Sequence, residues 1–144
     1  MAPKSKSPSY RQPRSVNIVS VAMVLLLGAA AYWVVCFGPA YFKLYRVKQL
    51  VHEAASKYYK LSFLEKGLRA QETNKLVNET RQSIVGVLGF DDPEMTVQLL
   101  VDQETKKVNV VAQYSHTVEL IGLNRRRILR MRAVGESDFK PNEW

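Results

Sequence analysis

Five arginines near the C-terminus are the residues whose type and spacing best suit a chemical role. Arg125, Arg126 and Arg127 are consecutive, and Arg130 and Arg132 follow with the two-residue spacing of a strand face. On a strand these last two would project together, on the face opposite Leu129, Met131 and Ala133. Guanidinium groups bind carboxylates and phosphates through paired hydrogen bonds, so this ridge predicts a contact with acidic protein, lipid phosphate or nucleic acid.

The same ridge has a second interpretation, which the sequence supports about equally. Charged side chains on an edge strand discourage the addition of further strands, without any ligand. Among ligands, nucleic acid ranks last, because the arginines are not interleaved with aromatic residues and no nucleic-acid-binding module is recognisable. The arginine series therefore predicts either a docking surface for an anionic partner or a protected sheet edge.

The remaining reactive residues are too scattered for a catalytic centre. The sequence has two histidines, His52 and His116, and one cysteine, Cys36. They lack metal-ligand spacing, and the chain has no glycine-rich phosphate loop and no nucleophile elbow. The acidic residues at 91–94 flank a proline and indicate a turn. We therefore expect no enzyme activity, no metal and no cofactor, a hydrogen-bonded structural role for His116 and an apolar packing role for Cys36.

A long uncharged run precedes these residues and predicts a membrane span. Residues 16–37 contain no charge, and about 20 apolar residues cross a hydrocarbon core of about 30 Å. We therefore predict a transmembrane helix over residues 16–38. The side chains that mark it are Val16, Leu25, Leu26, Leu27, Trp33 and Phe37. A cleaved signal peptide with its site at residues 29–31 is the alternative, although the run exceeds an ordinary signal sequence.

Charge distribution gives the expected topology. The net charge is +8, and residues 1–15 hold four basic residues and no acid, which predicts a disordered basic tail. The basic residues before the span slightly outweigh those just after it. We therefore expect a single-pass protein of the inner membrane, with a cytoplasmic N-terminus, the folded domain outside, and membrane lipid as its nearest partner.

Beyond the span the pattern changes from helix to strand. Gly38 and Pro39 either kink one long helix or start a new one, and residues 41–61 have the apolar spacing of an amphipathic helix. Residues 62–65 have capping-box spacing for a second helix, whose stronger part is 74–88 before a stop at Gly89.

The strands follow in the last third of the chain. Residues 96–102, 108–120 and 126–134 alternate apolar and polar positions, with turns at 103–106 and 122–124. The expected fold is α+β: one N-terminal transmembrane helix, then a domain over 39–135 with two helices packed on a three-stranded antiparallel sheet, and a polar tail over 136–144.

This plan resembles type IV pilins and pseudopilins, although no prepilin cleavage sequence precedes the span and the glutamate of their mature helix is missing. Residues 38–45, GPAYFKLY, and the strand-turn segment 108–122 are similar to a family of short uncharacterised bacterial envelope proteins. That resemblance implies a bacterial inner-membrane protein and supplies no activity.

Together these features predict a non-catalytic subunit or scaffold of a bacterial envelope assembly, with other membrane or envelope proteins as partners. Three alternatives stay open. They are a lipid- or polyanion-binding module that uses the arginine ridge, a pilin-like component, and a secreted ligand-binding domain released by signal cleavage. Binding of lipid headgroups should weaken steeply with ionic strength, whereas an apolar protein contact should not.

Overall fold

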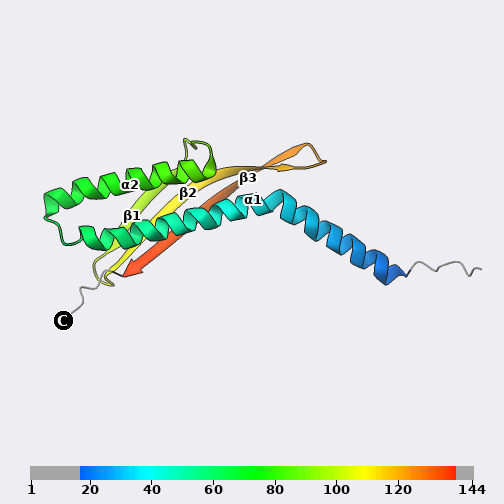
Figure 1. Cartoon of the computed structure of the whole chain (residues 1–144), viewed down its shortest axis with the longest axis horizontal. Helices are drawn as coiled ribbons and strands as arrows, with labels where there is room; N and C mark the ends of the chain where they lie inside the picture. Colours follow the sequence, from blue (N-terminus) through cyan, green and yellow to red (C-terminus); the bar gives the residue numbers. More distant parts are fainter. Residues whose placement is uncertain (1–16, 139–144) are drawn as a thin grey trace, which may run out of the picture. The chain divides into compact units, whose positions relative to one another are not determined.

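The computed structural model describes residues 17–138; the expectations for the basic tail, for Val16 and for residues 139–144 lie outside that range. The chain forms two helices followed by three strands (Figure 1): α1 (Ile18–Leu61), α2 (Lys66–Leu88), β1 (Thr96–Asp102), β2 (Lys107–Leu120) and β3 (Arg125–Asp138). The strands form one antiparallel sheet in the order β1-β2-β3, so the predicted α+β fold is confirmed. The described residues divide into two units, a first that ends at Trp33 and a second that begins at Val34.

Helix α1 is continuous and passes through Pro39 without ending. A proline inside a helix lacks the amide hydrogen that would bond four residues back, and its ring crowds that carbonyl. Of the two outcomes that the sequence left open, the chain adopts the single long helix. Its 44 residues are about twice the roughly 20 that cross a hydrocarbon core.

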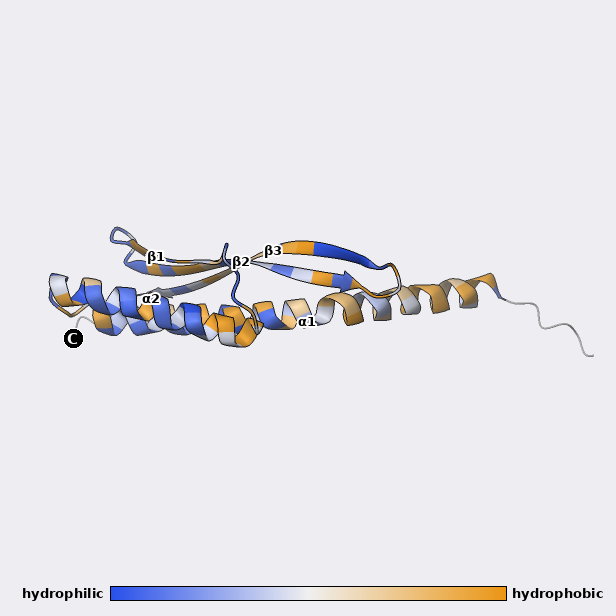
Figure 2. Ribbon diagram, turned by 90° about the horizontal axis from the view of Figure 1, so that it is seen from above, coloured by the Kyte–Doolittle hydropathy of each residue, from blue (hydrophilic) through white to orange (hydrophobic). Residues whose placement is uncertain are grey.

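The two parts of α1 differ in exposure. Side chains from Ile18 to Val35 are exposed on every face, and Leu26 is 72% exposed. This part is long and apolar enough to cross a membrane, and its most apolar window is not buried at all; Figure 2 shows mainly apolar colours there, with a few pale turns. Beyond it, residues on one helix face are buried: Cys36, Ala40, Val47, Val51, Ala54, Ala55 and Tyr58. This confirms the amphipathic helix.

Helix α2 begins later than its predicted cap. Glu65 occupies the N-cap position without a side-chain hydrogen bond. The Ser62 hydroxyl instead donates to the carbonyl of Tyr59, 2.6 Å away, at the end of α1. The capping-box prediction was therefore wrong, because the serine closes the preceding helix. The predicted stop is confirmed: Gly89 has φ of 79° and donates its N–H to the carbonyl of Val85.

The β2–β3 hairpin has two parts. Strand β1 pairs with β2 only from Lys107 to Gln113, whereas β3 pairs with β2 along its whole length. We call residues 107–113 and 132–138 the hairpin base, and residues 114–131 the hairpin tip. In the tip the sheet is a two-stranded ribbon.

Both helices of the second unit cover one face of the sheet (Figure 2). The inward residues of β2 alternate as predicted, and the buried core includes Ile84, Leu88, Val108, Val110, Ala112, Tyr114, Val118, Met131 and Ala133. Val111 is the predicted exception to the alternation. It points to the outer face but is only 5% exposed, between its cross-strand neighbours Gln98 and Val134.

Strand β3 is longer than predicted and continues to Asp138, so the expected tail from residue 136 was wrong over residues 136–138. Gly135 explains the extension. A side chain at this position would collide with the backbone of Val51 and His52 in α1, so the strand and the helix are in direct backbone contact there. Only glycine permits that approach.

Candidate functional site

The arginines of β3 occupy the edge strand of the sheet. Arg126, Arg130 and Arg132 share the outer face, opposite the buried Met131 and Ala133. This confirms the predicted placement of Arg130 and Arg132. Arg125 and Arg127 lie on the alternate face, near the turn, so the five arginines do not form one surface.

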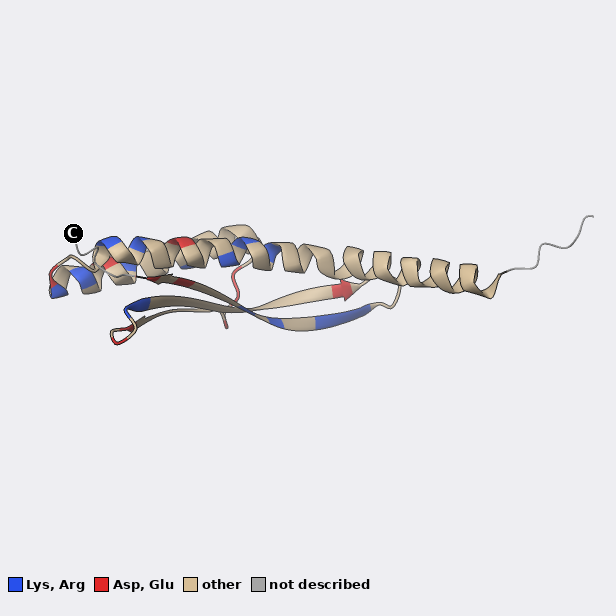
Figure 3. Cartoon of the chain, turned by 90° about the horizontal axis from the view of Figure 1, so that it is seen from below, with Lys and Arg blue, Asp and Glu red and all other residues tan. Residues whose placement is uncertain are grey.

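Few of these charges are neutralised. Arg126 forms an ion pair with Glu119 across the strands, at 2.9 Å. Within residues 17–138, no carboxylate lies within ion-pair distance of the other four arginines. Figure 3 shows this run of basic residues along the turn end of β3. The unpaired guanidinium groups remain available for an anionic partner.

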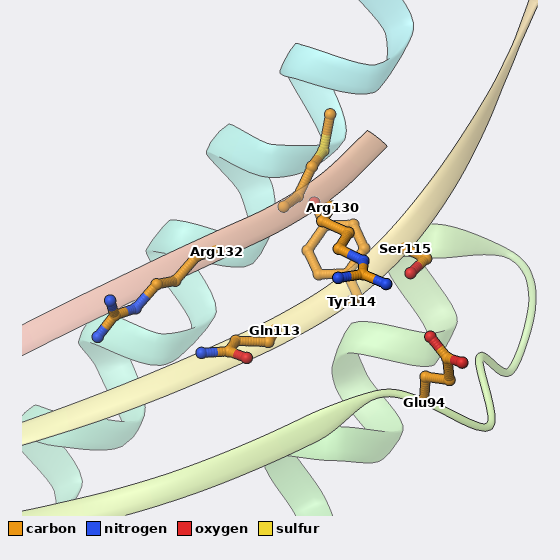
Figure 4. A pocket seen from close by; sticks show the side chains of 7 residues that line it. Glu94, Gln113, Tyr114, Ser115, Arg130 and Arg132 are labelled. Atoms are coloured by element: carbon orange, nitrogen blue, oxygen red, sulfur yellow. The ribbon is translucent and has the colours of Figure 1, made fainter. Parts of the chain in front are cut away.

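A hollow of about 310 Å³ lies beside Arg130 and Arg132 (Figure 4). Its other polar side chains come from two elements: Gln113 and Ser115 from β2, and Glu94 from the loop before β1. The register explains the grouping, because Arg132 pairs with Gln113 and Arg130 pairs with Ser115. Guanidinium, amide and hydroxyl donors therefore face the same space, with a single carboxylate at its rim.

Asp92 fixes the edge of this hollow. It is buried, and its carboxylate accepts the N–H of Ser115 at 2.6 Å and the N–H of Glu94 at 3.0 Å. Ser115 lies just beyond the part of β2 that pairs with β1, so Asp92 replaces the missing strand partner. The turn role predicted for the acidic residues at 91–94 is confirmed at Asp92.

Two titratable residues lie on the opposite, inward face. Burial raises the pKa of Tyr114 to about 12. Burial, together with the positive charge of Lys43, lowers the pKa of His116. His116 stacks on Phe90 with ring centroids 5.8 Å apart. Its Nδ1 has no hydrogen-bond partner among the described residues, so the expected hydrogen-bonded histidine is wrong at that atom.

The structure describes most of the residues predicted to mark the membrane span. Leu25, Leu26, Leu27 and Trp33 are all exposed on α1. Phe37 is half-buried and packs against the core of the second unit, because the buried face of α1 begins at the neighbouring Cys36.

The arrangement suits recognition of an anion by several hydrogen-bond donors. No group of three His, Cys, Asp or Glu side chains within residues 17–138 could hold a metal ion. Sequence reasoning missed Gln113, Ser115 and Glu94 as neighbours of the arginines. The alternation of β2 places Gln113 and Ser115 on the outer face, but only the register shows which residues of β3 they meet.

Comparison of the chain with protein-family models, with curated proteins and with solved structures gives no match, and the interpretation of the site therefore depends on its own geometry.

Proposed function

We propose that this chain is a non-catalytic single-pass membrane protein that acts as a docking subunit or scaffold of a bacterial envelope assembly. In this proposal the N-terminal part of α1 is the membrane anchor. The basic tail is cytoplasmic, and the second unit lies outside the inner membrane. The outer face of the sheet binds an acidic segment of a partner protein.

The exposed apolar part of α1 is the observation that supports the proposal most strongly. Three consecutive leucines at positions 25–27 are each at least 65% exposed. Apolar surface that stays in water forgoes a stabilisation of about 25 cal/mol per Å² that removal from water would give. A hydrocarbon environment supplies this stabilisation and leaves every backbone group of the helix hydrogen-bonded.

The hollow beside Arg130 and Arg132 supports the docking role. The two guanidinium groups have no carboxylate within ion-pair distance in the described part of the chain, and Gln113 and Ser115 add neutral donors. Glu94 at the rim would repel a carboxylate of the partner that came close to it. An acidic partner would therefore bind nearer to Arg130 and Arg132 than to Glu94.

Purification of the full-length protein from native membranes in mild detergent tests this function. Mass spectrometry would identify companions and the protein's own N-terminus. The informative variant is Arg130→Glu with Arg132→Glu. Lys48→Glu with Lys60→Glu is the matched control, because it changes the same charge at exposed positions of α1.

We expect stoichiometric companions with the wild type and the control, and at least an approximately tenfold loss with the arginine variant. The proposal fails if the arginine variant keeps the same companions as the control. It also fails if the mature chain begins after Ala31, which would indicate signal cleavage.

A further inference from the structure

The hairpin tip exposes apolar side chains at a place where turns are ordinarily polar. Leu123 and Ile128 are 62% and 71% exposed. The turn itself is well defined: the N–H of Leu123 donates to the carbonyl of Leu120, and Gly122 and Asn124 both have positive φ. Leu123 is therefore held by a specific turn conformation, whereas Ile128 lies on the outer face of β3.

Basic residues flank these apolar groups directly. Arg125 and Arg127 lie between Leu123 and Ile128, and neither has a carboxylate within ion-pair distance in residues 17–138. The nearby Glu119 is already paired with Arg126. Apolar side chains interleaved with cationic ones are typical of segments that lie in a membrane interface, where the former enter the acyl boundary and the latter meet phosphates.

The direction of the hairpin places this tip at a specific end of the second unit. Strand β3 contacts α1 where Gly135 meets Val51. Farther toward the turn, His116 pairs with Leu129. The charge of Lys43 in α1 contributes to lowering the pKa of His116, so these two residues are near each other. Along α1, Lys43 comes before Val51, and along β3, Leu129 comes before Gly135. Helix α1 and strand β3 therefore run in the same direction. The tip therefore points toward the end of the unit at which α1 enters it, as Figures 1 and 2 both show.

We propose that the hairpin tip is a second membrane contact, in which Leu123 and Ile128 enter the headgroup layer and Arg125 and Arg127 bind the phosphates of anionic phospholipids. This inference depends on the proposed function, because the α1 residues before Val34 must be in the membrane for the tip to reach it. It deepens that function by assigning the turn end of the tip, residues 123–128, to lipid, while the outer face near Arg130 and Arg132 remains for protein.

Depth measurement on the full-length protein tests the inference. The protein, with Cys36→Ala to remove its one cysteine, is reconstituted into phosphatidylcholine vesicles with or without phosphatidylglycerol. A fluorescent probe is attached at Leu123→Cys, and in a second preparation at Glu104→Cys in the exposed β1–β2 turn. Quenching by a water-soluble agent and by a lipid-bound agent reports the depth of each probe.

We expect the probe at position 123 to be quenched mainly by the lipid-bound agent in phosphatidylglycerol vesicles, and the probe at position 104 mainly from water. Arg125→Glu with Arg127→Glu should return the position-123 probe to water and reduce its lipid-bound fraction about tenfold. Arg130→Glu with Arg132→Glu should change it little. A probe at Ile128→Cys repeats the measurement should the Leu123 substitution disturb the turn.

Equal quenching of the probes at 123 and 104 from water would overturn the inference, as would equal depth with and without phosphatidylglycerol. Failure of the proposed anchor is distinguished by extraction at alkaline pH, which would release the whole protein from the vesicles. A protein that resists extraction while its tip stays in water leaves the proposed function intact and refutes only the tip contact.

Discussion

The base and the tip of the β2–β3 hairpin share two strands but differ in their contacts with the rest of the domain. In the base, Gly135 meets the backbone of α1, and Lys107 forms an ion pair with Glu136. In the tip, β1 is absent, and Leu123 and Ile128 are exposed. These two contacts tie the base to α1 and join its two strands. The turn end of the tip exposes apolar side chains, for which we have proposed a lipid partner.

This difference shows that strand pattern alone does not identify a binding surface. Both parts alternate apolar and polar residues with the same period, and both contain charges. What separates them is the backbone contact with α1 at Gly135 in the base and the exposure of Leu123 and Ile128 in the tip. Substitutions should therefore affect folding strongly in the base, and affect binding more than folding toward the tip.

The largest effect is expected from Gly135→Ala in the base. The added methyl group would overlap the backbone of Val51 and His52, and backbone cannot rotate away as a side chain can. We expect a loss of about 3 kcal/mol or more in the free energy of unfolding. Urea unfolding of the full-length protein in detergent, followed by circular dichroism, measures it.

Gly122→Ala is the matched substitution in the tip. Nothing lies within 4 Å of the added methyl group, and only the φ of 86° is unfavourable. The expected cost is about 1 kcal/mol. Equal losses at the two glycines would contradict the distinction between base and tip.

A smaller effect is expected at Asp92, on the border between base and tip. Asp92→Ala removes the acceptor of two backbone N–H groups, those of Ser115 and Glu94. We expect the free energy of unfolding to fall by about 1–3 kcal/mol. The substitution should also speed hydrogen exchange more in residues 114–120 than in the base. Asp92→Asn should recover part of the loss, because its side-chain oxygen can still accept.

Asp91→Ala is the control for this prediction. Asp91 is exposed, and its carboxylate lies 3.7 Å from the guanidinium group of Arg81. Exposed ion pairs of this kind contribute about 0–1 kcal/mol to the free energy of unfolding. If Asp92→Ala were no more destabilising than Asp91→Ala, Asp92 would not be the substitute for the missing strand partner.

Much of the fold could be predicted because local patterns specify it. The alternation from Val108 to Leu120 can be seen without tertiary information. Gly89 is a recognisable helix stop because glycine adopts the left-handed conformation of a C-cap without strain. The start of α2 was mispredicted because the Ser62 hydroxyl can either accept from a backbone N–H of the following helix or donate to a carbonyl of the preceding one. The sequence does not show which of these two hydrogen bonds forms. The extension of β3 through Gly135 was missed because its residues favour strands weakly and are held by pairing with β2.

The candidate site was predictable only in part, for the same reason. The spacing of Arg130 and Arg132 already requires a common face on a strand. Their neighbours Gln113 and Ser115 depend on the register of a hairpin whose turn length is not evident from periodicity. Glu94 belongs to a loop, and no periodicity relates a loop residue to a sheet face.

The smallest effect is expected from the titration of His116, near the start of the tip. Burial and Lys43 lower its pKa below the ordinary 6.5 in the folded protein, whereas the unfolded chain keeps the ordinary value. Above that value both states are neutral, so His116 contributes no pH dependence. As the pH falls below 6.5 the unfolded state takes up a proton first, so folding stability decreases until the pH reaches the folded pKa.

The measurement compares the free energy of unfolding at about pH 7.5 and about pH 5.5, a window above the ordinary pKa of most carboxylates. The wild type should lose stability on acidification, and His116→Gln should lose less, because glutamine does not titrate. Lys43→Gln should also reduce the loss, since it removes the charge that opposes protonation while leaving the burial unchanged. An unchanged pH dependence in His116→Gln would mean that the histidine is as hydrated in the folded protein as in the unfolded chain, and that the tip is open to water on its inner face as well as its outer one.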